Sequence, residues 1–227
     1  MRRRRRPVFL GLGAPDEFPD PRSADEHGLL AVGGDLSIER LLAAYSRGIF
    51  PWYDLGLPPL WWSPDPRTIM TPESLHVSTS MRRVLRRSAF TLSANTAFGA
   101  VIRACADREG GTWILPEMID AYTLLHEAGY AHSIEVWSGA SLVGGLYGVQ
   151  IGALFAAESM FHRASNASKL VLIQTVRMLF SAGIELFDVQ FPTAHLASLG
   201  AFPISRREYL FRAQNAARRP LHLALPA

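Results

Sequence analysis

The segment that most limits what this chain can fold into is residues 50–66, FPWYDLGLPPLWWSPDP. Four prolines precede its final Asp-Pro pair, and three tryptophans lie among them. Because proline has a fixed φ and no amide hydrogen, the segment can form neither a regular helix nor a central strand. We therefore expect an irregular aromatic layer here. A domain boundary near Ser63–Pro66 would separate a small N-terminal domain over 1–63 from a larger domain over 64–227.

Composition places the chain among ordinary globular proteins with a sizeable core. Of its 227 residues, 48% are apolar and 19% are charged, which argues against disorder, collagen-like repeats and a disulfide scaffold. The lone Cys105 can neither close an intrachain bridge nor assemble a thiolate metal site. No run approaches the ~18 apolar residues of a spanning helix, and residues 7–14 are too short and too rich in Pro and Gly for a signal-peptide core. We expect a cytoplasmic protein without membrane contact.

Positive charge is concentrated at the N-terminus. The formal net charge is +3, and Arg2 to Arg6 supply +5 of it, so residues 7–227 carry −2. Runs of this kind are solvated tails or nucleic-acid-binding arms. We expect residues 1–6 to form a disordered basic tail, with the arm as the alternative.

The pattern of helices and strands predicts an α/β (α+β) chain. Ser37 is a suitable N-cap for a helix over 38–47 that Gly48 ends. The larger domain is expected to begin with a helix over 79–87, and its later elements have the order strand, two helices, three strands, helix, strand. The first strand lies over 90–94, and the two helices lie near 96–108 and 117–128. The three strands cover 132–138, 141–150 and 153–162. The next helix runs from an Asn166 cap through Leu179, the last strand covers 184–191, and short helices near 193–199 and 206–216 complete the chain. This order is that of a GNAT-like acyltransferase domain with a mixed central sheet.

Several well-known motifs are missing or broken. Gly11-Leu12-Gly13 follows no strand and is interrupted by Pro15, so it is no dinucleotide fingerprint. There is no phosphate-binding P-loop, no HExxH zinc motif and no complete nucleophile elbow. A GNAT enzyme that uses acetyl-CoA needs a glycine-rich turn before its central helix, but here that junction reads FHRASNASK. Coenzyme A and metal ions therefore fit poorly.

Glu158 lies in an otherwise apolar central strand. Because alternate side chains of a strand share a face, Glu158 is expected to point the same way as Met160. An unpaired buried carboxylate is costly, which leaves two interpretations open. Glu158 is either paired with Arg163 or Lys169, or aimed at a cationic substrate.

Asp188 and Gln190 form a second candidate pair. They lie two residues apart in the expected strand 184–191, so they should project from one face and Val189 from the other. A carboxylate beside an amide can orient an amine and accept its proton. A purely structural hydrogen-bonded pair is the alternative.

The basic residues show two patterns. Lys169 is the only lysine, against 22 arginines, so either a compact ammonium is needed there or the choice is chance. Arg82, Arg83, Arg86 and Arg87 form a stripe on one helix without interleaved acids, which favours contact with a phosphate backbone over a solvated face. Four tryptophans are available to stack on bases or to fill a core, namely Trp52, Trp61, Trp62 and Trp113.

Seven strings, in this order along residues 27–210, resemble the leucyl/phenylalanyl-tRNA–protein transferase family. They are GGDLSIERLLAAYSRGIFPW, LWWSPDPR, HSIEVW, LVGGLYGV, ESMFHRASNASK, DVQF and HLASLGA. The resemblance implies transfer of Leu or Phe, and weakly Met, from aminoacyl-tRNA to the α-amine of proteins that begin with Arg or Lys. The product would be an N-degron for proteolysis, and the fold a GNAT-like domain without CoA behind a small N-terminal domain.

The resemblance also implies roles for particular residues. Its acidic residue and amide fall on Asp188 and Gln190, and its strand glutamate falls on Glu158. The implied aminoacyl pocket is formed by Leu146, Phe155, Thr175, Leu179 and Phe187. The implied aromatic platform for adenosine is formed by Trp52 and Trp113. The implied tRNA-binding cluster consists of Arg82, Arg83, Arg86 and Arg87. The motif residues Arg163, Asn166, Ser168 and Lys169 receive no role. Ala157 departs from an expected glycine, and Thr175 and Leu179 from common aromatic residues.

The implied reaction needs no cofactor and no metal, because an aminoacyl ester is already activated. Proximity of the two substrates should supply most of the rate, with Asp188 as the orienting carboxylate and possible base. Two other functions remain: an acetyl-CoA-dependent N-acetyltransferase on the same fold, and a tRNA-binding module without activity.

Overall fold

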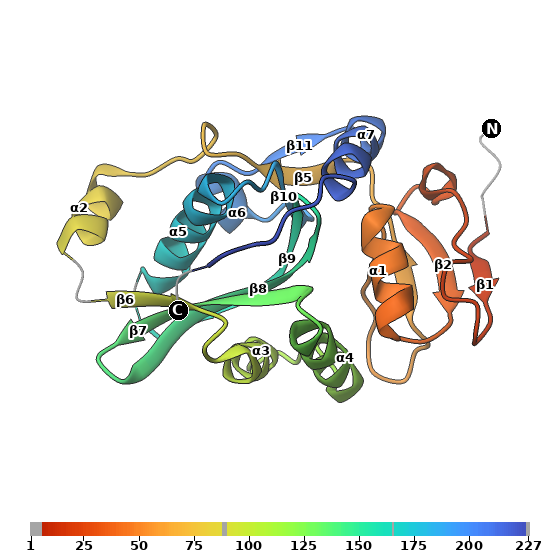
Figure 1. The fold of residues 1–227 in the computed structure, drawn as a ribbon, viewed down its shortest axis with the longest axis horizontal. Helices are drawn as coiled ribbons and strands as arrows, with labels where there is room; N and C mark the ends of the chain where they lie inside the picture. Colours follow the sequence, from red (N-terminus) through yellow and green to blue (C-terminus); the bar gives the residue numbers. More distant parts are fainter. Residues whose placement is uncertain (1–5, 88–89, 165, 226–227) are drawn as a thin grey trace.

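Two β-sheets organise the chain. The computed structural model describes residues 6–87, 90–164 and 166–225 (Figure 1). A four-stranded sheet has the order β1-β2-β4-β3, and a seven-stranded sheet has the order β11-β5-β10-β9-β8-β7-β6. Arg2 to Arg5 of the basic tail lie outside the described residues, so the expected disorder of that tail stays a prediction.

The small sheet contains the proline- and tryptophan-rich segment. Its strands are β1 (Val8–Leu10), β2 (Leu29–Gly33), β3 (Phe50–Pro51) and β4 (Leu60–Trp62). β4 pairs with both β2 and β3, so the prediction that residues 50–66 hold no central strand is wrong. The reason is that the three residues of β4 contain no proline; the prolines flank the strand at 58, 59 and 64.

The first helix follows the sequence signals closely. α1 covers Ile38–Ser46, and the Ser37 hydroxyl accepts a hydrogen bond from the Arg40 amide at 3.4 Å. Gly48, with a φ of 74°, ends it as predicted. A single turn of 3-10 helix, Pro21–Ser23, precedes β2.

The large sheet is mixed. Its only parallel pair among the described residues is β9 with β10; all its other neighbours are antiparallel. The strands are β5 (Arg67–Met70), β6 (Phe90–Ala94), β7 (Ala131–Ser138), β8 (Ser141–Ile151), β9 (Leu154–His162), β10 (Leu186–Gln190) and β11 (Phe202–Ile204). The sequence did not predict β5 or β11. The order from β6 to β10 is the predicted one, and it confirms the mixed α/β fold.

Helices lie on both faces of the large sheet, as Figure 1 shows, with α3 and α4 on one face and α5 and α6 on the other. α2 packs against α5, and α7 packs against α1, β9 and β10. The bounds are α2 (Thr79–Arg87), α3 (Phe98–Ala106), α4 (Pro116–Glu127), α5 (Ala167–Ser181), α6 (Ala194–Ser198) and α7 (Arg206–Ala217).

One hydrophobic cluster joins the small sheet to the large one. It contains Trp61 of β4 and Tyr45 of α1 together with Val101 of α3 and Tyr122 of α4, each at most 2% exposed. The two sheets therefore share apolar packing. The division into domains at 1–63 and 64–227 stays a prediction.

The parallel strands β9 and β10 stay paired over only part of their length. The register joins Leu154 to Leu186 and ends at Ala156 with Asp188. Beyond these residues both strands carry irregularities in their other ladders. The gap that opens between the ends of β9 and β10 is where the main pocket lies.

Candidate active site

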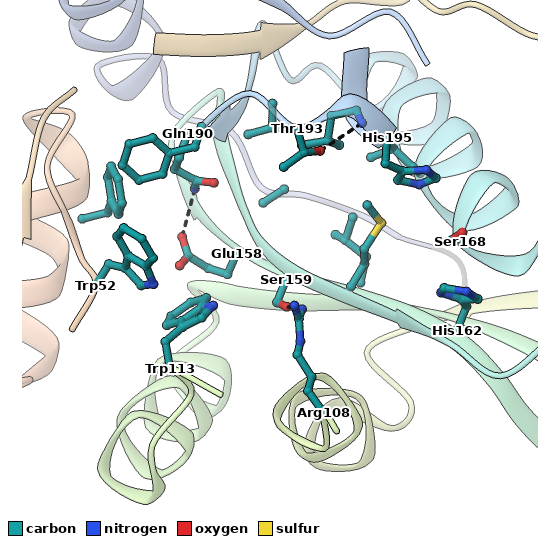
Figure 2. A pocket seen from close by; sticks show the side chains of 18 of the residues that line it. Trp52, Arg108, Trp113, Glu158, Ser159, His162, Ser168, Gln190, Thr193 and His195 are labelled. Carbon is teal, nitrogen blue, oxygen red and sulfur yellow. Dashed lines mark hydrogen bonds between the residues drawn. The ribbon is translucent and has the colours of Figure 1, made fainter. Parts of the chain in front are cut away.

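A pocket of about 710 Å³ opens where β9 and β10 separate. Figure 2 shows Trp52 and Trp113 at one end and His162, Ser168 and His195 at the other, with Glu158 nearer the tryptophans. The wall is formed by Phe50, Pro51, Trp52, Arg108, Trp113, Leu146, Ala157, Glu158, Ser159, Met160, His162, Asn166, Ser168, Lys169, Leu172, Val189, Gln190, Phe191, Thr193, His195 and Leu196.

Glu158 reaches the pocket because β9 contains a bulge there. Tyr147 of β8 pairs with Ser159, but the next residue, Gly148, pairs with Ala157, which leaves Glu158 as the extra residue. A bulge interrupts the alternation of side chains. The four residues 157–160 consequently all line the pocket. Glu158 and Met160 share it as expected, but the alternation that would place Ala157 and Ser159 on the opposite face is interrupted.

Neutral donors surround the Glu158 carboxylate. Oε1 accepts a hydrogen bond from the Gln190 side-chain amide at 3.3 Å, and Oε2 accepts one from the Tyr122 hydroxyl at 3.4 Å. Tyr122 in turn shares a 2.5 Å hydrogen bond with Tyr45. Burial raises the pKa of Glu158 to about 8, and the Asp188 carboxylate adds to the rise against the lowering effects of Tyr45, Arg67 and Tyr122.

Neither predicted ion pair of Glu158 forms. The Glu158 carboxylate accepts hydrogen bonds from Gln190 and Tyr122, and the Arg163 guanidinium lies instead over the Phe161 ring, 5.4 Å from its centroid. Glu158 is thus a polar group of the pocket rather than half of a buried salt bridge. Tyr45 and Tyr122 are a part of the site that sequence reasoning did not find, although Tyr45 lies inside one of the family-like strings.

Asp188 and Gln190 do not share a face. In the ladder with β5, Asp188 pairs with Ile69 and Gln190 with Thr68, so Val189 is an extra residue. Gln190 has a φ of +55°, in the left-handed region. The bulge turns Val189 and Gln190 into the pocket and leaves Asp188 outside its lining, which corrects the prediction drawn from spacing alone.

The Asp188 carboxylate is fully engaged behind the pocket. Oδ1 accepts hydrogen bonds from Arg67 Nε at 2.8 Å and from the backbone N–H of Gln190 at 2.9 Å. Oδ2 accepts them from Arg67 Nη2 at 2.5 Å and from the Tyr209 hydroxyl at 2.8 Å. Asp188 and Arg67 are 0% and 1% exposed. This geometry makes Asp188 the anchor that sets the backbone of Gln190.

Arg67 is a further residue that sequence reasoning missed. Its guanidinium lies 4.5 Å from the ring centroids of both Phe50 and Tyr209. Burial acts to lower the pKa of Arg67, but Asp188 and other neighbours raise it above the ordinary value, so the group stays charged. Because Phe50 lines the pocket, Arg67 links the aromatic end of the pocket to the Asp188 anchor.

Trp52 and Trp113 both line the aromatic end of the pocket, as the platform prediction requires. Trp52 is 40% exposed and lies 5.4 Å from the Phe191 ring and 5.8 Å from the Trp62 ring, measured between centroids. Trp61, by contrast, is fully buried and donates to the Gly33 carbonyl at 2.8 Å. Trp61 therefore belongs to the core and not to a base-stacking surface.

Only Leu146 of the five predicted aminoacyl-pocket residues lines the pocket. Phe155, Thr175, Leu179 and Phe187 are 0% exposed and lie behind the wall, where the two phenylalanine rings stack 5.7 Å apart. Thr175 and Leu179 lie outside the lining because only the first two turns of α5 form the pocket wall, and these two residues lie further along the helix. The observed apolar wall is instead formed by Leu146, Met160, Leu172 and Leu196.

The start of α5 brings three of the four motif residues without an assigned role to the pocket. Asn166, Ser168 and Lys169 line it, and Arg163 does not. Asn166 occupies the N-cap position as predicted, but with a φ of 66° its side chain makes no capping hydrogen bond. His162 and His195, which appear scattered in the sequence, join Lys169 at this end.

The arginine stripe of α2 faces outward. Arg82, Arg83 and Arg86 are exposed, whereas Met81 is 3% exposed and packs in the same cluster as α5. Arg82 Nε donates to the Val77 carbonyl at 3.1 Å. The side chain of Arg87 lies outside the part of the chain described. A solvent-facing basic surface is therefore present next to α5.

In residues 6–87, 90–164 and 166–225, no helix is long and apolar enough to cross a membrane. No three His, Cys, Asp or Glu side chains gather there as a metal site would require.

Comparison with known proteins gives consistent matches along the chain. A family model described as leucyl/phenylalanyl-tRNA protein transferase matches residues 69–214, and the model of that family's N-terminal domain matches residues 34–65. A protein of Anaeromyxobacter sp. (strain K) named leucyl/phenylalanyl-tRNA--protein transferase is 54% identical over 218 residues, which cover 94% of this chain and 93% of that protein. One of the same name from Legionella pneumophila (strain Corby) is 50% identical and covers 89% and 92%.

Solved structures match more distantly. FemX gives a TM-score of 0.45 at 10% identity, covering 74% of this chain and 66% of that one. A GCN5-related N-acetyltransferase from Kribbella flavida gives 0.40 at 11% identity, covering 70% and 57%.

Proposed function

Because this chain belongs to the leucyl/phenylalanyl-tRNA–protein transferase family and is an aminoacyltransferase, we propose that the pocket joins an aminoacyl-tRNA end to the N-terminus of a protein that begins with Arg or Lys. The transferred residue is Leu or Phe, with Met as a weaker substrate. The product carries a new N-terminal residue that acts as an N-degron for proteolysis. The reaction takes place in the cytoplasm.

The observation that supports this most strongly is the position of Glu158. It is the only acidic side chain among the described residues that line the pocket, and apolar and aromatic groups surround it. Once Glu158 is ionised, its charge is available to a cation, because its hydrogen-bond donors are neutral and Arg67 is engaged with Asp188. The Arg or Lys side chain of the acceptor supplies that cation.

The apolar wall suits the donor side chain. Leu146, Met160, Leu172 and Leu196 present aliphatic and thioether surface without a charge. Such a wall separates substrates that differ by one methylene by only ~1–3 kcal/mol, so modest leakage toward Met is expected. The adenine ring stacks on Trp52 and Trp113 at the aromatic end.

The chemistry requires only positioning and proton transfer. The neutral α-amine attacks the ester carbonyl, a C–N bond forms, and the bond from that carbonyl to the ribose oxygen breaks. The amine proton passes to the ribose oxygen, which leaves as the free hydroxyl of the tRNA. At pH 7, about a tenth to a fifth of an α-amine with a pKa of about 7.7–8.0 is neutral, and orientation of the two substrates can contribute roughly 7–11 kcal/mol.

Gln190 and Asp188 have different parts in this scheme. Gln190 lines the pocket beside Glu158 and can accept a hydrogen bond from the attacking amine. Asp188 does not line the pocket, and its oxygens are engaged with Arg67, Tyr209 and the Gln190 amide. We therefore assign Asp188 as a positioning residue that acts through Gln190, in place of the base role expected from sequence.

The direct test incubates the protein with labelled Phe-tRNA and a peptide that begins with Arg. Labelled Phe should appear at the peptide N-terminus, and should not appear on the same peptide when it is N-acetylated or begins with Ala. Acetyl-CoA in place of Phe-tRNA should give no product. Binding of Phe-tRNA without any transfer would refute the proposed function, and acetylation of the peptide would favour the N-acetyltransferase alternative.

A further inference from the structure

We propose that the first turn of α5, with Lys169, His162 and His195, binds a phosphate group, and that this group is a phosphodiester of the 3′-terminal strand of the donor tRNA. The inference rests on the proposed function, because it assigns a further part of the same donor. It concerns the end of the pocket away from Trp52 and Trp113 (Figure 2).

Two polar groups at this end lack partners. Ser168 lines the pocket and is 8% exposed, and its side-chain hydroxyl has no hydrogen bond to a described residue. His195 Nε2 is buried and likewise has no partner within the described part of the chain. A buried polar group without a partner costs about 1–3 kcal/mol. His195 Nε2 on α6 is such a group, and the Ser168 hydroxyl on α5 lines the same end of the pocket, so together they indicate a place that a polar ligand fills.

The charge at this end selects an anion. The first turn of α5 contains no acidic residue, and the N-terminus of a 15-residue helix carries partial positive charge. Lys169 and His162 lie at the same end and add to the positive potential there. Burial is the main cause that lowers the pKa of His195, and Lys169 and His162 lower this pKa further. The one acidic residue of the lining, Glu158, lies nearer the tryptophans (Figure 2).

The surroundings point to the phosphate of an RNA strand. α2, with its exposed arginines, packs against α5, so the anionic strand that contacts this stripe passes α5 on its way into the pocket. Lys169 and His162 are exposed at the rim, while the apolar wall with Leu146 and Leu172 is buried deeper. A phosphodiester at the rim is thus compatible with an aminoacyl side chain against the wall.

The test isolates the charge of one phosphate. Puromycin is an aminoacyl-adenosine analogue without a phosphate, and cytidylyl-puromycin adds one nucleotide through a phosphodiester. The same dinucleotide with a neutral methylphosphonate linkage keeps the cytidine and removes the charge. Calorimetry should show that the wild-type protein binds the charged dinucleotide about ten-fold more tightly than the neutral one.

Lys169→Ala and Ser168→Ala should each reduce this preference to about three-fold or less; the puromycin affinity of each variant is measured as its own baseline. Arg177→Ala is the matched control, because Arg177 is an exposed cation of the same helix that does not line the pocket. It should keep the full preference.

Equal binding of the charged and neutral dinucleotides by the wild-type protein would overturn the subsite, as would an undiminished preference in both pocket variants. Continued transfer of Phe to the Arg-initiated peptide would show that the proposed function survives such a result. If none of the three analogues bound and no transfer occurred, the proposed donor would fail and the subsite with it.

Discussion

Glu158 illustrates how one residue can carry both recognition and a cost in stability. Its bulge places a carboxylate in an apolar pocket with hydrogen-bond donors that carry no charge. The raised pKa means that the group is mostly protonated at neutral pH and becomes ionised as the pH passes about 8. Its affinity for a cation should follow that titration.

The KM for an Arg-initiated peptide should therefore fall between pH 7 and pH 9, because the acceptor side chain stays charged while Glu158 ionises. Glu158→Gln should raise KM about ten-fold at pH 9 and remove this pH dependence. The acceptor amine also titrates in this range, so the KM of the wild-type protein is divided by the KM of the variant at each pH. A KM ratio that stays constant from pH 7 to pH 9 would contradict the assigned role.

The same substitution should change stability in a pH-dependent way. In the unfolded chain Glu158 ionises near its ordinary pKa of 4.5, whereas in the folded protein it stays protonated up to about 8. Stability is therefore lost as pH rises from 4.5 to 8. Glu158→Gln removes this loss, so its Tm relative to wild type should rise between pH 4.5 and pH 8 in thermal scans. A flat difference would show that Glu158 is not protonated in the folded state.

Asp188 is held at the residue scale by a buried ion pair. Asp188→Ala leaves the Arg67 guanidinium buried without its partner, and we expect a loss of about 3–5 kcal/mol in denaturant unfolding. Transfer should fall severely with tRNA affinity retained, because Gln190 loses its anchor. Asp188→Asn keeps the shape and should be folded with an intermediate rate. Unchanged turnover in both variants would remove the positioning role.

At the scale of elements, two bulges in neighbouring strands build the site. The extra residues Glu158 in β9 and Val189 in β10 both lie just after the last paired residues of the parallel ladder. Each bulge redirects side chains that a regular strand would place elsewhere. The opposite strand β8 accommodates the first bulge at Gly148, where a Cβ would lie 2.4 Å from the Ala156 carbonyl oxygen.

Gly148→Ala should therefore displace the bulge, lower the free energy of unfolding by about 1–3 kcal/mol and reduce transfer. Gly110→Ala is the matched control, because nothing lies within 4 Å of a Cβ there and its φ is not in the left-handed region. Unfolding and transfer assays on the two variants are compared. Wild-type behaviour of Gly148→Ala would mean that the backbone around Glu158 is more adaptable than its geometry indicates.

At the scale of the whole molecule, the large sheet holds the pocket while an outer helix presents the basic surface. α2 buries Met81 against the cluster that contains α5 and leaves Arg82, Arg83 and Arg86 exposed. The acceptor stem of a tRNA is an anionic cylinder, so this surface should hold it through phosphates and with little dependence on sequence.

Changing Arg82, Arg83, Arg86 and Arg87 to Ala should weaken aminoacyl-tRNA binding and reduce the slope of log K against log salt. The expected reduction is about 0.7–0.9 for each phosphate contact that is lost. Deletion of Arg2 to Arg6 serves as a comparison and should change the slope little. An unaltered slope in the α2 variant would show that this stripe is only a solvated face, and a large loss in the deletion would assign binding to the tail.

The local signals of the sequence were sufficient for most strands of the large sheet and for the helices around it. Ser37 and Gly48 bound α1, and the strands from β6 to β10 lie within two residues of their predicted limits. β5 and β11 were missed because each is short and gains its hydrogen bonds only from partners far along the chain. The three residues of β4 were missed because the prolines on both sides of them argued against any regular strand in this segment.

The sequence by itself determined the family, the mixed sheet, and the residue types that the site uses, because motifs and periodicity are local properties of the chain. Tertiary structure alone decided which side of a strand each residue occupies. Spacing placed Asp188 with Gln190, and the bulge at Val189 separated them; spacing treated the histidines as scattered, and the fold joined His162 to His195. A bulge and a meeting of distant segments both depend on partner strands and helices, which no short stretch of sequence contains.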